Sequence, residues 1–207
     1  MMPRVERKAG DEIVALGRAL YDRGITPGRT GNLSVRVGGN VLLTPTGVSL
    51  GRLDVEGLSL VSLDGTHLQG GAPTKESALH LALYERFPEV GAVAHGHTTH
   101  AVAWSCRTDL DIADALPPLT AYFAMRVGRL PLIGYAPPGD PALAQDLRAV
   151  GAKHALLANH GSIASGSTLE AAVDALEEIE ETARIALLLN GIQCRSLSAD
   201  QVSQFAG

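Results

Sequence analysis

Cysteine is scarce in this chain of 207 residues, which has only Cys106 and Cys194. The two share no motif spacing, so the sequence gives no indication of a disulfide framework. Apolar runs long enough to span a bilayer are missing, and the polar start MMPRVERKAG is unlike a secretory signal. We therefore expect a cytoplasmic protein that does not associate with a membrane.

Long basic runs are also absent, and the formal net charge is −5 at pH 7. This pattern lacks the electrostatic footprint of a nucleic-acid-binding protein, so nucleic acid is not expected as a partner. An anionic small molecule is still compatible with the sequence, because local arginines or backbone amides hold an anion whatever the overall charge. The apolar share of 45% is ordinary for a globular chain, and we expect a single domain over residues 1–207.

The hydrophobic periodicity predicts helices and strands that alternate irregularly. Helices are expected near 8–23, 75–87 and 140–150, from a capping box at Ser167–Glu170 to Asn190, and in short stretches after His97 and Ser198. Thr74 is predicted to cap the second of these helices. Strands are expected near Leu33–Val37, VLLT, Leu58–Leu63, VGAVAHGH, RLPLIGY and HALLANHG. Hairpin-like strands early in the chain favour a layered α/β domain with a mixed or antiparallel sheet.

The motif AVAHGHTTH carries the main chemical signal. His95 and His97 are two residues apart, so on a strand both imidazoles project from the same face. Gly96 between them lets the backbone pass close to another element. His160 follows the apolar stretch ALLAN in what reads as a similar setting. Three neutral imidazoles that leave one position open are the ligand set of a catalytic zinc site.

Not every histidine supports this interpretation, because a lone buried histidine is more often a hydrogen-bonded core residue than a ligand. We keep that simpler interpretation for His67, His80 and His154. His100 falls one helical turn after His97. It is a candidate either to hydrogen-bond a metal ligand or to contact the substrate.

Glu76 lies in the segment PTKES, where the first turn of a helix is expected. A helix N-terminus favours the carboxylate form, and a nearby cation favours it further. A carboxylate beside an open zinc position serves as a resting ligand and then as a general acid–base. From spacing alone, the simpler interpretation is a glutamate that only complements the helix dipole.

Two glycine-containing loops, GRTGN and TPTGV, match neither a Walker A motif nor a dinucleotide fingerprint. Both offer backbone amides and small hydroxyls, and Asn32, Thr46 and Gly47 are the natural anion binders. Ordinary turn chemistry is the simpler interpretation of either loop alone.

Taken together, GNLS, TPTG, PTKE, HGHTTH and NHG occur in this order over nearly the whole chain and resemble the class II aldolase/adducin family. The resemblance implies a three-layer α/β/α fold around a largely antiparallel sheet, and a homotetramer with active sites at subunit interfaces. It implies one zinc ion per subunit, with manganese or cobalt as the alternatives. The implied ligands are His95, His97, His160 and Glu76, and the same glutamate is the implied catalytic residue.

The resemblance also places Asn32, Thr46, Gly47 and Thr74 at phosphate-binding positions. One departure is that the sugar-phosphate aldolases usually have Ser-Ser-Glu where this chain has Thr74-Lys75-Glu76. The adducin branch lacks a complete metal site, so the intact histidine triad favours an enzyme.

A narrower resemblance, carried by LPPLTAYFAMRVGRLPLIGYAPPGDPAL and by Lys75, is to the 3-oxo-tetronate 4-phosphate decarboxylase subgroup. It implies a phosphorylated four-carbon sugar acid as substrate, with dihydroxyacetone phosphate and carbon dioxide as products of a metal-stabilised enediolate. Lys75 is a candidate to hold substrate charge, although an exposed first-turn lysine explains it nearly as well. Tyr122 and Arg126 are candidates to reach the site of a neighbouring subunit.

Two alternatives stay open at this level. One is an aldolase that cleaves a ketose phosphate such as fuculose 1-phosphate, because retro-aldol cleavage and decarboxylation both leave an enediolate. The other is a non-catalytic, adducin-like oligomeric binding module.

Overall fold

A single mixed sheet of eight strands organises the chain, in the order β4-β3-β2-β1-β5-β8-β7-β6. The computed structural model describes residues 4–205. The strands are β1 (Asn32–Val37), β2 (Asn40–Leu43), β3 (Ser59–Ser62), β4 (His67–Gln69), β5 (Ala92–Gly96), β6 (Leu132–Ile133), β7 (Ala155–Leu157) and β8 (Gly161–Gly166). Neighbouring strands in this described part pair antiparallel, with the exception of the parallel pair β6–β7.

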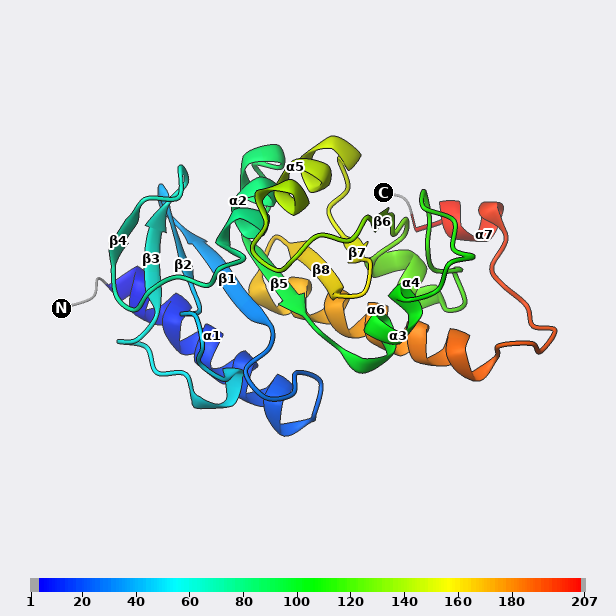
Figure 1. Cartoon of the computed structure of the whole chain (residues 1–207), viewed down its shortest axis with the longest axis horizontal. Coiled ribbons are helices and arrows are strands. Elements are labelled where there is room, and N and C mark those ends of the chain that lie inside the picture. The colour runs from blue at the N-terminus through cyan, green and yellow to red at the C-terminus, as the bar shows by residue number, and fades with distance from the viewer. Residues whose placement is uncertain (1–3, 206–207) are drawn as a thin grey trace.

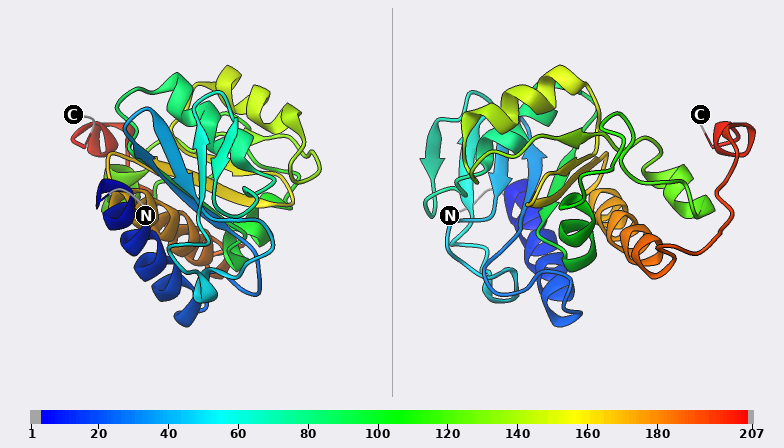
Figure 2. Two further views of the ribbon diagram at one scale, coloured as in Figure 1. Left: turned by 90° about the vertical axis from the view of Figure 1, so that its left-hand side faces the viewer. Right: turned by 45° about the vertical axis from the view of Figure 1, so that its right-hand side comes forward.

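Helices cover both faces of the sheet (Figures 1 and 2). One face carries α2 (Ser77–Arg86) and α5 (Pro141–Val150), and the other carries α1 (Arg4–Asp22), α3 (Thr99–Ser105) and α6 (Leu169–Leu188). The remaining helical segments are η1 (Leu50–Arg52), α4 (Ala121–Arg126) and α7 (Ala199–Ser203). The predicted three-layer α/β/α fold with a largely antiparallel sheet is confirmed. Over residues 4–205, no helix combines the length and apolarity needed to cross a membrane.

The pleat of β5 aims the central motif at one side of the sheet. Ala94 packs in the apolar core shared with α1 and α6, whereas Val93 packs in the core beneath α2 and α5. Since successive strand residues point to opposite faces, His95 lies on the α2 side and Gly96 on the α6 side. His97, two residues after His95, continues on the α2 side.

The start of α2 differs from the prediction. The helix begins at Ser77 with Glu76 at the N-cap position and no side-chain cap, so the predicted Thr74 cap is wrong. Thr74 instead accepts a hydrogen bond from the Glu76 N–H through its hydroxyl at 3.3 Å. The reason is a tertiary contact: Pro73 pairs with Pro45 in an isolated bridge, and this pairing holds the segment out of the helix. Glu76 therefore stands just before the first turn.

Two further predictions need correction. The cap of α6 is Thr168, which accepts a hydrogen bond from the Ala171 N–H, rather than Ser167. The expected strand through HALLANHG stops at Leu157, and His160 lies in the turn between β7 and β8. The sequence of β8, GSIASG, is rich in glycine and serine and has little strand propensity, so it was not predicted.

Candidate active site

Four side chains converge where β5, β8 and the start of α2 meet: Glu76, His95, His97 and His160. One ligand atom from each lies within 4.8 Å of all the others. The centroids of the three imidazole rings are 4.8, 5.0 and 4.6 Å apart. The structure thus brings all four predicted ligands together from separate segments.

The backbone around His95 fixes the orientation of its ring. His95 Nδ1 lies 2.9 Å from the carbonyl oxygen of Ser162 in the neighbouring strand. Because a carbonyl only accepts, Nδ1 carries the proton and donates, which leaves Nε2 bare and facing the cluster. The imidazole of His160 reaches the cluster because Gly161 packs closely against Gly96. A Cβ on Gly161 would collide with the carbonyl of Gly96. That close approach places His160 beside the end of β5.

Several buried atoms of this cluster have no hydrogen-bond partner in the described chain. His160 Nε2 and Glu76 Oε1 lie 2.9 Å apart, yet without hydrogen-bond geometry, and both stay unpartnered. His95 Nε2 lies 3.3 Å from Glu76 Oε2. Buried polar atoms are nearly always satisfied, so lone pairs that converge without partners indicate room for a cation. Three imidazole nitrogens and one carboxylate oxygen suit a divalent transition metal.

The pKa shifts of Glu76 and His97 also suit a metal. Burial alone would raise the pKa of Glu76, but the attraction of His95 and the contacts with the three imidazoles outweigh it and hold that pKa far below its ordinary value. Burial lowers the pKa of His97. An ionised carboxylate and neutral imidazoles are the forms that bind metal ions.

A cavity of about 180 Å³ opens beside Glu76 and is lined by the two glycine-containing loops. The predicted anion-binding residues in its wall are Asn32, Thr46, Gly47, Thr74 and Lys75. Arg29, which was not singled out from the sequence, also lines it. Arg29 and Lys75 are exposed, and neither takes part in an ion pair within residues 4–205. The signal for Arg29 was its place inside GRTGN, but a loop arginine has no spacing rule that marks it.

The side chain of Asn32 faces inward as well as lining this cavity. Asn32 Nδ2 donates to Glu76 Oε2 at 2.8 Å, and its Oδ1 lies 2.5 Å from His80 Nε2. His80 was expected to be a hydrogen-bonded core residue, and it is fully buried and hydrogen-bonded. Its link to Glu76 through Asn32 could not be seen from the sequence.

A second cavity, of about 500 Å³, lies against His97 and His160. Its other lining residues are Thr99, Val102, Tyr135, Pro138 and Asn159. No lysine or arginine of the described residues lines it. The histidine cluster therefore separates a cavity with two cations from a larger one with none.

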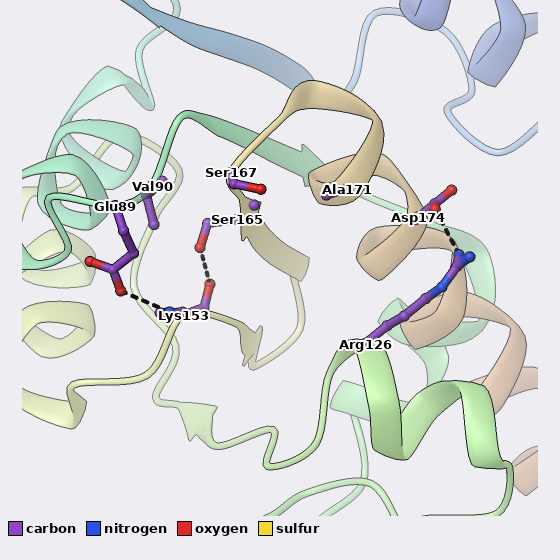
Figure 3. A pocket seen from close by; sticks show the side chains of 9 residues that line it. Glu89, Val90, Arg126, Lys153, Ser165, Ser167, Ala171 and Asp174 are labelled. Atoms are coloured by element: carbon purple, nitrogen blue, oxygen red, sulfur yellow. Dashed lines mark hydrogen bonds and ion pairs between the residues drawn. The ribbon is translucent and has the colours of Figure 1, made fainter. Parts of the chain in front are cut away.

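Three further candidates lie outside the cluster in this chain. His100 Nδ1 lies 2.7 Å from Glu180 Oε1, so its ring is held at the start of α3. Arg126 pairs with Asp174 of α6 at 2.9 Å and lines a separate cavity (Figure 3). Tyr122 is 58% exposed on α4. Whether Tyr122 and Arg126 serve a neighbouring subunit stays a prediction.

The fold and the cluster define a class of protein, and the comparison with family models agrees with it. Residues 11–187 match the model described as Class II Aldolase and Adducin N-terminal domain. The chain belongs to this family, and the resemblance drawn from the motifs is confirmed. The family uses a divalent metal ion, and the cluster of one glutamate and three histidines could hold one.

Individual relatives are closer still. A 3-oxo-tetronate 4-phosphate decarboxylase from Haemophilus influenzae is 48% identical over 92% of this chain and 92% of its own. The crystal structure of YgbL from Escherichia coli superposes with a TM-score of 0.95 at 39% identity, over 99% of this chain and all of that one. An L-fuculose phosphate aldolase from Methanococcus maripaludis is 31% identical over 88% of this chain and 98% of its own. The curated relatives are lyases, and the prediction of an enzyme of this class is confirmed.

Proposed function

We propose that this chain is a metal-dependent carboxy-lyase that converts 3-oxo-tetronate 4-phosphate into dihydroxyacetone phosphate and carbon dioxide. The observation that carries the proposal is the centre of three histidines and Glu76 beside a cavity lined by Arg29 and Lys75, which form no ion pair within residues 4–205. The 48% identity to the Haemophilus influenzae decarboxylase supports the choice of substrate.

We propose zinc as the ion, one per subunit, held by His95, His97, His160 and Glu76. The donor set supports zinc, because three histidines with one exchangeable position are typical of catalytic zinc. Manganese and cobalt are the alternatives. When bound, the ion supplies Lewis-acid stabilisation of negative charge on the ketone and hydroxyl oxygens of the substrate.

The two cavities give the substrate a direction. We expect the phosphate to lie in the smaller cavity, with Arg29 and Lys75 as counter-charges. The Thr46 hydroxyl and the Gly47 N–H are the expected donors, because the Thr46 N–H already donates to the Ala72 carbonyl. The carboxylate end then points to the larger cavity, whose described lining has no cation. A carboxylate that no lysine or arginine of the same chain holds is favoured to leave as neutral carbon dioxide, which is the chemistry that a decarboxylase needs.

The reaction consumes one proton. The bond between C1 and C2 breaks, its electron pair stays on C2 as an enediolate, and C2 then takes up a proton to form the hydroxymethyl group of the product. Glu76 borders the smaller cavity and is the acid–base group that we expect to deliver this proton. Since Glu76 rests as a carboxylate, it first takes up that proton from solvent water and then transfers it to C2.

Two other functions compete with this one. The 31% identity to an L-fuculose phosphate aldolase supports an aldolase, which would also have to remove a hydroxyl proton so that an aldehyde departs. A non-catalytic binding module is disfavoured by the unpartnered lone pairs at Glu76 and His160, which a purely structural centre would satisfy.

The assembly and location are parts of the same proposal. We propose one domain over residues 1–207 and a homotetramer with active sites at subunit interfaces. The apolar side chains of Tyr122 and Met125, exposed by 58% and 50% on α4, support such an interface. We propose a cytoplasmic location, supported by the free thiols of Cys106 and Cys194.

One experiment separates the two lyase reactions. The purified zinc form is offered 3-oxo-tetronate 4-phosphate and, separately, ketose 1-phosphates, and carbon dioxide and aldehyde are both measured. We expect carbon dioxide from the first and no aldehyde from the second. Aldehyde from a ketose phosphate without carbon dioxide from the sugar acid would overturn the decarboxylase. No binding of zinc, manganese or cobalt and no turnover would overturn both reactions.

A further inference from the structure

A hydrogen-bonded series of four buried side chains runs from Glu76 into the protein, and only its first member, Asn32, lines a cavity. Asn32 and Ser34 alternate on β1 and share one face, while His80 and Tyr84 are one helical turn apart on α2. Strand β1 and helix α2 therefore each direct two polar side chains toward the other element. None of the four is more than 5% exposed.

The hydrogen bonds of this chain are continuous. Asn32 Nδ2 donates to Glu76 Oε2 at 2.8 Å, and Asn32 Oδ1 lies 2.5 Å from His80 Nε2. His80 Nδ1 lies 2.7 Å from Ser34 Oγ, which lies 2.8 Å from the hydroxyl of Tyr84. Four contacts thus connect Tyr84 with the carboxylate.

The chemistry of the groups gives these bonds one direction. An ionised carboxylate only accepts, so the Asn32 amide must donate to Glu76 and its oxygen must accept from His80. His80 therefore carries its proton on Nε2, and its bare Nδ1 accepts from Ser34. The Ser34 oxygen can then accept from Tyr84, so each donor points toward Glu76.

Burial keeps the hydrogen-bonded side chains in these protonation states. It lowers the pKa of His80 to about 3, so the ring is neutral near pH 7. It also raises the pKa of Tyr84, which keeps the hydroxyl proton available for donation. A neutral imidazole with one donor and one acceptor is the link that a directional chain needs.

We infer that His80, Ser34 and Tyr84 are positioning residues that hold the Asn32 amide against Oε2 of Glu76 and so fix the direction in which this carboxylate delivers its proton. The inference rests on the proposed role of Glu76 as acid–base. Without these hydrogen bonds, the Asn32 amide is free to rotate. The Glu76 carboxylate then loses the only amide donor that it has within residues 4–205.

The state of His80 is testable without turnover. In metal-free protein labelled with ¹⁵N-histidine, we expect the His80 resonances of a neutral ring protonated at Nε2, unchanged from pH 7 to pH 5. Protonation at Nδ1, or titration near pH 6.5, would overturn the inference.

Kinetics test the positioning role with a matched control. Ser34→Ala and Tyr84→Phe break the chain, while Ser165→Ala removes another buried hydroxyl, one that donates to the Lys153 carbonyl outside it (Figure 3). We expect kcat to fall by about tenfold in the two chain variants with KM unchanged, because partners behind a ligand typically contribute 10–100-fold. The solvent deuterium isotope effect on kcat should rise, since proton delivery becomes slower. The inference is wrong if both variants behave like Ser165→Ala.

Substitution of the histidine itself provides a rescue. His80→Leu removes the donor to Asn32, whereas His80→Gln keeps an N–H near the position of Nε2. We expect the glutamine variant to recover at least half of the kcat that the leucine variant loses, and equal loss in both would count against the positioning role. Full activity of Glu76→Gln would refute the proposed acid–base role of Glu76 and with it this inference, whereas absence of carbon dioxide release from the wild-type protein would refute the proposed function.

Discussion

Two buried glutamates in this molecule have similar exposure and opposite bonding. Glu180 on α6 is 9% exposed, and its oxygens accept from the backbone N–H groups of His100 and Ala101 at 2.9–3.1 Å and contact the His100 ring at 2.7 Å. Glu76 is 7% exposed, but its Oε1 has no hydrogen-bond partner in the described chain.

The difference separates a structural role from a functional one. Burial raises the pKa of each carboxyl, but local partners lower it by more, so both pKa values lie below the ordinary value and both carboxylates rest ionised. At Glu180 the partners are fixed donors at the start of α3, which stabilise the fold. At Glu76 the partners include three imidazoles whose lone pairs point into the same space. The hydrogen-bonding capacity of Oε1 is therefore satisfied only by a cation or a substrate proton. Partner chemistry, rather than burial, distinguishes the carboxylate that we propose to be catalytic.

The largest effect is expected from Glu76→Gln. This isosteric change removes the acid–base group, and we expect kcat to fall by about 10³-fold while zinc binding by the three histidines persists. Steady-state kinetics and metal analysis of the purified variant measure both. Wild-type turnover in Glu76→Gln would show that Glu76, like Glu180, has no catalytic role. In deuterated water, the wild-type enzyme should place one deuterium on the hydroxymethyl carbon of the product.

Glu180→Ala should affect stability instead. It leaves backbone donors at the start of α3 without their acceptor, and we expect the free energy of unfolding to fall by about 3 kcal/mol. Urea unfolding measures the loss, with Glu181→Ala on the exposed side of the same helix as control, where the ion pair with Arg184 contributes at most about 1 kcal/mol. For the folded variant, a kcat reduced as far as in Glu76→Gln would contradict the comparison.

Metal should stabilise the region of Glu76 and leave that of Glu180 unaffected. At zinc concentrations near 100 times the dissociation constant, we expect about 2.7 kcal/mol of added stability. The gain should persist in Glu180→Ala and disappear in His160→Ala, and thermal unfolding with and without zinc compares the three proteins. Equal gains in all three would place the metal elsewhere.

The last prediction concerns two buried histidines and the dependence of stability on pH. Burial lowers the pKa of His80 to about 3 and that of His154 to about 4, so the unfolded chain binds more protons than the folded one below pH 6.5. Stability of the metal-free protein should therefore fall as pH drops from 6.5 toward 4, by up to about 1.4 kcal/mol per pH unit for each histidine. His154→Gln should remove the contribution of one proton to the slope of the free energy of unfolding against pH. An unchanged slope would show that His154 does not contribute.

The sequence predicted the elements with regular periodicity and missed those without it. Helix α5 was expected over 140–150 and spans Pro141–Val150, because Asp140 caps it and a proline opens it. Strand β8 was missed because its partners, rather than its own residues, determine its conformation. Thr74 resembled a cap, but a bridge to another segment controls where α2 begins.

The local sequence alone was enough to make His95 and His97 a pair, since the period of two in a strand aims alternate side chains at one face. The order of the motifs identified the family, and with it His160 and Glu76. Tertiary structure decided what surrounds them: Arg29 and Lys75 in the wall of one cavity, and His80 behind Asn32. Those contacts join segments far apart in the chain, and local periodicity carries no information about which segments will meet.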